Sequence, residues 1–170
     1  MRAAVLGAGA VGARVARQLL SGGLVDQVVL RDTDADRLAW VSRSLGERLI
    51  IEHAPFPASL EADVVVVATP GGTQLPAVVD ALAHQRPVIT TGDGLAETVA
   101  MLKLAPQAQE AGVSVVLGAG FAPGLSCVLA AHGAMWLDHV EEIHVAKAGT
   151  GVPACALVHH RALSRIAYDW

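Results

Sequence analysis

The sequence has few cysteines, few aromatic residues and no clustered positive charge, and each shortage excludes a class of protein. With only Cys127 and Cys155, the chain cannot build a disulfide framework. The spacing of these cysteines and the seven histidines matches no zinc motif, so we expect no metal site. The 12 lysines and arginines are scattered and the net charge is −4, so we expect no nucleic-acid partner.

Long apolar runs are also missing. No run reaches the roughly 18 residues that a membrane-spanning helix needs, and Met1 and Arg2 lead directly into a strand-like segment. We therefore expect neither a membrane span nor a signal peptide, and a cytoplasmic location. Charged residues make up 16% of the sequence, against about 25% in typical globular chains, and the mean hydropathy is +0.48. A surface so poor in charge favours a homodimer.

What the sequence does contain is an alternation of short apolar runs with segments of helical periodicity. Several runs are continuously apolar, most plainly the valines at 64–67, which is typical of parallel strands covered on both faces. We predict an α/β fold with a doubly wound, mainly parallel sheet and helices on both of its faces. The expected strands are residues 3–6, 27–30, 48–52, 64–69, 88–91, 113–117 and 142–146, and the expected helices are residues 11–20, 35–45, 73–84, 95–110 and 125–136.

The strongest motif is a G-x-G-x-x-G hexapeptide between the first expected strand and the first expected helix. In a dinucleotide site, Gly7 permits the tight turn, Gly9 lets the backbone approach a pyrophosphate, and Gly12 allows the helix to pack on the strand. The N–H groups that open the helix, including those of Ala10 and Val11, then face the phosphates. The alternative is a glycine-rich turn without a ligand.

Asp32 lies twenty residues after the last glycine of the motif, at the end of the second expected strand. A carboxylate at this position can accept hydrogen bonds from both hydroxyls of an adenosine ribose, which favours NAD. The 2′-phosphate of NADP would meet the negative charge of Asp32, although Arg31 and Arg37 are close enough in sequence to soften that repulsion. We therefore predict NAD as the cofactor, in preference to NADP.

Two loops follow the fourth and fifth expected strands, and ligands bind at such loops in doubly wound sheets. We expect Thr69, Pro70 and Gly71 to line the cofactor, although an ordinary strand-to-helix turn would use the same residues. In the next loop, residues 90–94, Asp93 either faces a substrate or begins the following helix.

A third loop, residues 118–126, follows the sixth expected strand and contains three glycines and a proline. It precedes a helix whose first N–H groups lack partners within the helix, which suggests a backbone site for an anion or for the nicotinamide. We expect Gly120 and Phe121 to contact the cofactor.

The chain resembles the saccharopine dehydrogenase-like family of Rossmann oxidoreductases. The resemblance rests on the glycine motif, on the Ala-Thr-Pro sequence at 68–70, and above all on Gly-Phe-Ala-Pro-Gly-Leu-Ser at 120–126. It implies an NAD(P)-dependent enzyme that acts on the C–N bond of an amino acid or an imine adduct. The chain also resembles, more distantly, dehydrogenases of the aspartate and diaminopimelate type.

The resemblance covers residues 1–150, which we predict to be an NAD(P)-binding Rossmann domain. Members of the family carry a substrate-binding domain after this point, so residues 151–170 would be a C-terminal helical segment, either the start of that domain or an association element. The chain as given would then be catalytically incomplete, without most groups that recognise an amino-acid-like substrate. The alternative function is a non-catalytic, NAD-binding regulatory module.

Several reactive side chains have ordinary structural explanations. Solvated or capping roles are more common than catalysis for His132, His159 and His160. Lys147 ends the last expected strand, where a lysine is more often solvated than bound to a substrate. Cys127 has apolar neighbours in sequence and is expected to be buried and unreactive. We therefore name no catalytic residue.

Overall fold

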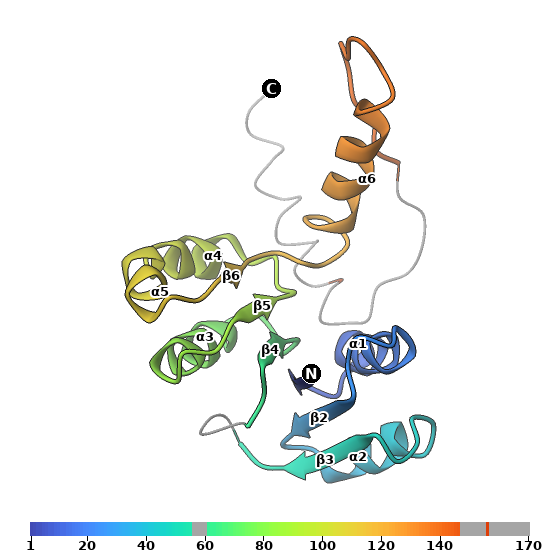
Figure 1. Ribbon diagram of the computed structural model, residues 1–170, viewed down its shortest axis with the longest axis vertical. Helices are drawn as coiled ribbons and strands as arrows, with labels where there is room; N and C mark the ends of the chain where they lie inside the picture. The colour runs from blue at the N-terminus through green and yellow to red at the C-terminus, as the bar shows by residue number, and fades with distance from the viewer. Residues whose placement is uncertain (56–60, 147–155, 157–170) are drawn as a thin grey trace. The chain divides into compact units, whose positions relative to one another are not determined.

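Six parallel strands form one sheet in the computed structural model, which describes residues 1–55, 61–146 and 156 (Figure 1). The strand order is β3-β2-β1-β4-β5-β6, so the order reverses between β1 and β4. This is the doubly wound arrangement that the alternating pattern predicts, and that prediction is confirmed. The strands are β1 (Arg2–Leu6), β2 (Gln27–Asp32), β3 (Leu49–His53), β4 (Val64–Val67), β5 (Val88–Thr90) and β6 (Val115–Val116).

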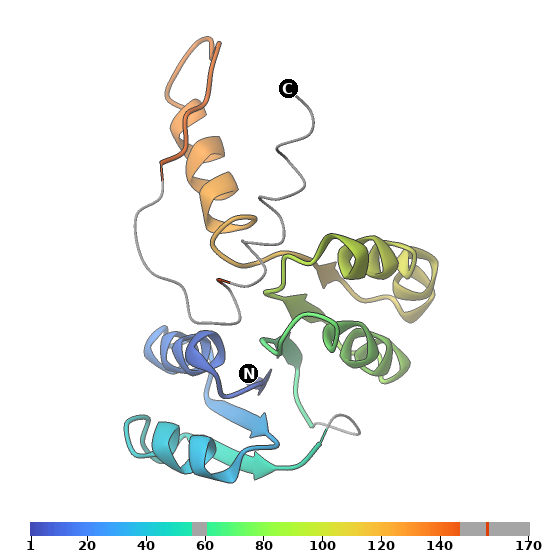
Figure 2. The same ribbon diagram turned by 180° about the vertical axis from the view of Figure 1, so that it is seen from behind.

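Helices cover both faces of this sheet. Figures 1 and 2 show α1 and α2 on one side of the strands and α3, α4 and α5 on the other. Each of these faces has its own apolar core. The helices are α1 (Ala10–Ser21), α2 (Ala35–Ser42), α3 (Gln74–Ala83), α4 (Leu95–Leu102), α5 (Ala105–Ala111) and α6 (Leu125–Ala134).

The central strand β1 is buried on both faces. Ala3 and Val5 belong to the core under α1 and α2, whereas Ala4 and Leu6 belong to the core under α3. All four side chains are at most 3% exposed. Since successive side chains of a strand point to opposite faces, a strand covered twice must be apolar at every position, which explains the continuous run.

The chain divides into two units, residues 1–119 and residues 120–170. The first contains the whole sheet and α1 to α5, and the described part of the second contains α6. The side chains of Val128, Leu129 and Trp136 in the second unit are more than half exposed. The division of the chain near residue 150 stays a prediction.

Two predicted elements are wrong in the structure. The helix expected at 95–110 is two helices, α4 and α5, separated at Lys103 and Leu104. Pro106 lies in the first turn of α5, where it is tolerated, but it could not continue α4 because it lacks an N–H and its ring would clash with a preceding carbonyl. The strand expected at 142–146 has no strand conformation, and its Ile143 and Val145 are each 59% exposed. Alternating apolar residues do not make a strand without a neighbouring strand to pair with.

Other expectations concern parts of the chain outside the description. The boundary at 149–153, Lys147, His159, His160 and, apart from Ala156, the C-terminal helical segment all lie outside the described residues. Among the residues that are described, no helix is long and apolar enough to cross a membrane.

Candidate functional site

Two of the three motif glycines are required by the fold itself. Gly7 begins the turn after β1 with a φ of +98°, and a Cβ atom there would lie 2.7 Å from the carbonyl oxygen of Ala68. A Cβ atom on Gly12, on the buried side of α1, would lie 1.8 Å from the carbonyl oxygen of Gly7. A side chain on Gly7 would push the turn away from the backbone that follows β4, and one on Gly12 would push α1 away from the turn. Both positions therefore need glycine, as the sequence analysis expects.

Gly9 is different, because nothing in the described chain requires a glycine there. Its φ of −68° and ψ of −174° suit any residue, and no atom of the described residues lies within 4 Å of the position its Cβ would take. Gly9 is the N-cap of α1 and provides no side-chain cap, and the first turn contains no acidic residue. The N–H groups at the start of this helix, those of Ala10 and Val11 included, therefore face open space with the positive end of the helix dipole.

The carboxylate of Asp32 is buried beside this turn, with only 8% of the residue exposed. Its Oδ2 accepts a hydrogen bond of 2.6 Å from the backbone N–H of Ala8, inside the glycine motif. Its Oδ1 accepts one of 2.9 Å from the N–H of Asp34. Arg37 Nη1 also approaches Oδ2, at 3.5 Å. A carboxylate offers about four acceptor positions, so at least one remains for a ligand. The structure thus brings the acid of the second strand directly against the glycine turn.

The two arginines near Asp32 have different partners. Arg31 Nε donates to Glu52 Oε2 on β3 at 2.9 Å, which engages its guanidinium away from Asp32. Arg37, on α2, lies 3.5 Å from Asp32 Oδ2 and 3.2 Å from Asp34 Oδ2. Only Arg37 therefore offsets the charge of Asp32 directly.

The loop between β4 and α3 lies next to the glycine turn, since the backbone of Ala68 packs against Gly7. Thr69 is 7% exposed, and its hydroxyl has no hydrogen-bond partner within the described residues. Pro70 and Gly71 are exposed, and the Pro70 carbonyl accepts a hydrogen bond of 2.7 Å from the Thr73 hydroxyl. The predicted residues of this loop and of the glycine motif thus lie together at the carboxyl ends of the two central strands, β1 and β4.

Two residues beside this loop escape the sequence analysis. The side chain of Gln74 is fully buried, and its amide joins the carbonyl of Thr69, at 2.8 Å, to the N–H of Gly92, at 3.2 Å. Glu97 reaches the same loop from α4. Gln74 is a polar residue at the start of the apolar helix α3, and this position could have marked it as a structural residue. Its hydrogen-bond partners, 5 and 18 residues away, are not visible in a sequence pattern.

The loops after β5 and β6 are linked to each other. The N–H of Ala119 donates to the carbonyl of Thr90 at 2.8 Å, and the N–H of Gly118 lies 3.4 Å from the Thr90 hydroxyl. Asp93 is exposed and does not begin the next helix, because the N-cap of α4 is Gly94. Thr90 is therefore a buried anchor for these loops.

Gly120 and Phe121 belong to the second unit, so they are described apart from the glycine turn. They form a tight turn before α6, in which the carbonyls of Gly120 and Phe121 accept hydrogen bonds from Leu125 and Ser126. Phe121 is 50% exposed. Their predicted contact with a cofactor stays a prediction.

The expectation that Cys127 is buried is wrong, because this thiol is exposed on α6. The apolar neighbours that suggested burial, such as Leu125 and Val128, are themselves about half exposed or more. A backbone hydrogen bond from Gly124 and the Ser126 hydroxyl lower the pKa of the Cys127 thiol. His132 is exposed and forms a T-shaped contact with the Trp136 ring, with 6.1 Å between ring centroids and 83° between the ring planes.

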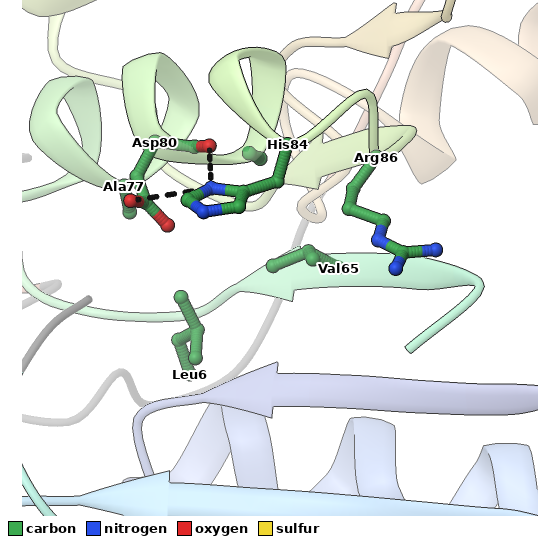
Figure 3. Close-up of a pocket in the computed structure, with 7 residues that line it drawn as sticks. Leu6, Val65, Ala77, Asp80, His84 and Arg86 are labelled. Atoms are coloured by element: carbon green, nitrogen blue, oxygen red, sulfur yellow. Dashed lines mark hydrogen bonds and ion pairs between the residues drawn. The ribbon is translucent and has the colours of Figure 1, made fainter. Parts of the chain in front are cut away.

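A small cavity lies away from the glycine turn, between α3 and the sheet. It measures about 20 Å³, which is room for about one water molecule. Figure 3 shows that Asp80 and His84 of α3 contact each other at its edge, where His84 Nδ1 lies 2.9 Å from the Asp80 carbonyl oxygen. This cavity is too small for a dinucleotide, and the candidate site is the edge of the sheet around Gly9 and Asp32.

A family model of ketopantoate reductase PanE/ApbA matches residues 3–142, which include every residue of the sheet except Arg2 and every described residue of the candidate site. The chain belongs to this family. The resemblance noted in the sequence thus identified an oxidoreductase of the Rossmann type, but the family match points to another branch than the saccharopine dehydrogenase-like one.

Solved structures share the fold. Saccharopine dehydrogenase (L-Glu forming) from Saccharomyces cerevisiae is 18% identical with a TM-score of 0.61, over 79% of this chain and 31% of that protein. GenD2 from gentamicin A biosynthesis, solved in complex with NAD, is 25% identical with a TM-score of 0.58, over 79% and 38%. The WlbA dehydrogenase from Chromobacterium violaceum, solved with NADH and UDP-GlcNAcA, is 16% identical with a TM-score of 0.61, over 80% and 40%. This chain spans about two fifths or less of each protein's length.

Proposed function

We propose that this chain is the nicotinamide-dinucleotide-binding domain of an oxidoreductase, with NAD(H) as its cofactor. The observation that carries the proposal is the open space over Gly9. This glycine is the N-cap of α1 and has ordinary backbone angles, and within residues 1–55, 61–146 and 156 no atom lies within 4 Å of its Cβ position. A glycine that the chain does not need, at the uncapped start of a helix, leaves room for a pyrophosphate to reach the backbone.

The residues around Gly9 suit the remaining parts of such a ligand. The N–H groups at the start of α1 would bind the pyrophosphate, and Asp32 would accept hydrogen bonds from the adenosine ribose. The buried hydroxyl of Thr69, without a described partner, would gain one at the second half of the site. When bound, the nicotinamide supplies the hydride, and the protein orients it and excludes water.

The preference for NAD over NADP rests on the surroundings of Asp32. A 2′-phosphate would approach a carboxylate that is 8% exposed and cannot turn away, because two backbone N–H groups hold its oxygens. Arg31 is engaged by Glu52, which leaves Arg37 as the one arginine among the described residues that pairs with Asp32. Repulsion between two anions so close together disfavours NADP.

The substrate class that fits both likenesses is a small organic acid with a carbonyl or imine carbon. The family name specifies reduction of a keto acid, and the resemblance to saccharopine dehydrogenase specifies the C–N bond of an amino acid or imine. Both reactions move a hydride between the nicotinamide and one such carbon. A non-catalytic NAD-binding module would share the geometry of Gly9 and Asp32, and the family match favours the oxidoreductase.

The test is titration calorimetry of the chain with NADH and with NADPH. We expect tighter binding of NADH, and we expect Asp32→Asn to weaken NADH binding about tenfold or more, because a hydrogen bond to a charged group contributes about 1.5–3 kcal/mol. Asp138→Asn, which removes the charge of an exposed residue in the second unit, is the control and should bind as the unchanged chain does. Binding of neither nucleotide would refute the function. Tighter binding of NADPH that depends on Arg37 would refute the preference.

A further inference from the structure

Glu97 holds the loop between β4 and α3 from a neighbouring helix. It lies in the first turn of α4, and its Oε2 accepts a hydrogen bond of 2.7 Å from the N–H of Gly72. Its Oε1 accepts hydrogen bonds from the N–H groups of Gln74, at 2.7 Å, and Leu75, at 2.9 Å. We refer to these three bonds as the Glu97 cap.

The Glu97 cap replaces a cap that α3 does not provide for itself. The N-cap residue Thr73 makes no side-chain hydrogen bond to the helix, because its hydroxyl donates to the Pro70 carbonyl. The first N–H groups of α3 are satisfied by a carboxylate that comes from α4 instead. Three bonds to one carboxylate are charge-assisted and hold the loop more firmly than neutral bonds would.

The two helices that begin where the strand order reverses, α1 and α3, differ in how their first N–H groups are satisfied. Both α1 and α3 begin at the carboxyl ends of adjacent parallel strands, β1 and β4. The start of α1 has no cap and no acidic residue, whereas the start of α3 is occupied by Glu97. A phosphate is thus attracted to α1 and repelled from α3, where a carboxylate already takes the N–H groups.

Gln74 holds the other end of the same loop. Its buried amide joins the Thr69 carbonyl to the N–H of Gly92, and a Cβ atom on Gly92 would lie 2.6 Å from that amide. The loop is thus tied to residues after β5 at Thr69 and to α4 at Gly72. Gly72 has a φ of +90°, a conformation that only glycine adopts at low cost.

We propose that Glu97 is a positioning residue for the nicotinamide half of the dinucleotide, acting through the loop at residues 69–72. The inference rests on the proposed function. In a doubly wound fold the two halves of the sheet each bind one mononucleotide, and Asp32 assigns the adenosine half to β1–β3. The loop after β4 then belongs to the nicotinamide half, and the contact between Gly7 and Ala68 places it beside the glycine turn.

The substitution Glu97→Gln separates positioning from helix capping. The amide oxygen of a glutamine still accepts the hydrogen bonds of Gln74 and Leu75, but its NH₂ group is a donor and faces the N–H of Gly72. Capping of α3 is thus largely kept while Gly72 is released. Glu97→Ala removes both interactions, and Glu110→Gln, at an exposed glutamate on α5, is the matched control.

The experiment measures, by calorimetry, the affinity of the full 170-residue chain for NADH and for ADP-ribose, which lacks the nicotinamide. We expect Glu97→Gln to weaken NADH binding about tenfold and to change ADP-ribose binding by less than about twofold. Glu97→Ala should have at least the same effect on NADH, and the control should have none. Amide hydrogen exchange followed by NMR should show faster exchange at Gly72 in Glu97→Gln than in the unchanged chain.

The outcomes distinguish this inference from the function on which it rests. If Glu97 only stabilises α3, the variants lower the melting temperature but leave the ratio of NADH to ADP-ribose affinity unchanged, and the positioning role is refuted. An equal loss of both affinities refutes it as well, since the effect is then not confined to the nicotinamide half. If the unchanged chain binds neither ligand, the proposed function itself is wrong and this inference is wrong with it.

Discussion

Replacing Gly9 with valine should abolish dinucleotide binding while leaving the fold intact. The backbone angles of Gly9, −68° and −174°, lie in the extended region that β-branched residues readily adopt, and no atom in the described part of the chain lies within 4 Å of the new Cβ. The hydrogen bond from the Ala13 N–H to the Gly9 carbonyl uses only backbone atoms and is kept. Valine is a poorer N-cap than glycine, which lowers stability, but it also reduces the conformational entropy of the unfolded chain, which raises stability. The free energy of unfolding should therefore change by no more than about 1 kcal/mol.

The effect on binding should be much larger. A branched side chain at residue 9 fills the space through which a pyrophosphate reaches the N–H groups of α1. Loss of two charge-assisted hydrogen bonds, at about 1.5–3 kcal/mol each, removes about 3–6 kcal/mol of binding free energy. Since about 1.4 kcal/mol corresponds to a factor of ten, NADH affinity should fall more than about 100-fold.

Two other glycines provide the comparison. Gly133→Val, on α6, also adds a side chain with no atom within 4 Å of its Cβ, and it should leave NADH affinity unchanged. Gly12→Ala places a Cβ 1.8 Å from the Gly7 carbonyl oxygen, so it should lower the melting temperature as well as the affinity. Calorimetry with NADH and thermal unfolding followed by circular dichroism measure both quantities. If Gly9→Val retains NADH affinity within about threefold, the glycine is only part of a turn and our assignment of the pyrophosphate is wrong.

Four further predictions concern other parts of the chain. The exposed Cys127, whose thiol pKa is lowered, should react with iodoacetamide at neutral pH faster in the folded chain than in the same chain unfolded in urea, measured by mass spectrometry in a Cys155→Ser background; an equal or slower rate in the folded chain contradicts this. The pairing between the N-terminal amine and Asp26 raises the pKa of the amine and lowers the pKa of the carboxyl group. The pair therefore stabilises the fold above the ordinary Asp pKa of 3.8 and below the ordinary amine pKa of 8.0. Asp26→Asn should therefore flatten the dependence of the melting temperature on pH at both ends of that window, and an unchanged profile excludes a contribution from the pair. Sedimentation should detect a species near twice 17.5 kDa, and the chain alone should show no amino-acid dehydrogenase activity; a clean monomer, or turnover by this chain, would contradict these two expectations.

Local sequence determined most of the sheet. The strands from β1 to β6 fall within or close to the apolar runs that predict them. The run is continuous in the central strands β1 and β4, because a strand covered on both faces must be apolar at every position. Where the pattern misled, the deciding interaction was not local. The run at 142–146 has the residues of a strand but no neighbouring strand to pair with. The long helix expected at 95–110 is interrupted before Pro106, because this proline is tolerated only in the first turn of a new helix.

The candidate site shows the same division. The sequence contains three motif glycines that look equivalent, and the pattern assigns them roles from a general template. Only the tertiary structure distinguishes Gly7 and Gly12, whose missing side chains make room for the protein's own backbone, from Gly9, whose missing side chain leaves open space. That distinction depends on where Ala68 and the turn before the first helix lie in three dimensions. The amino-acid sequence of residues 7–12 alone does not reveal it.

Burial and long-range hydrogen bonds decided the rest. The position of Asp32 could be predicted from spacing alone, because an acid at the end of the second strand is close to the first turn in any fold of this topology. Gln74 and Glu97 could not, since their partners lie on other loops and helices. A glutamate in the first turn of a helix is ordinarily a favourable charge for that helix. Only the packing of α4 against α3 places its carboxylate on the N–H groups of the neighbouring helix, because that contact is made by the folded chain and not by adjacent residues.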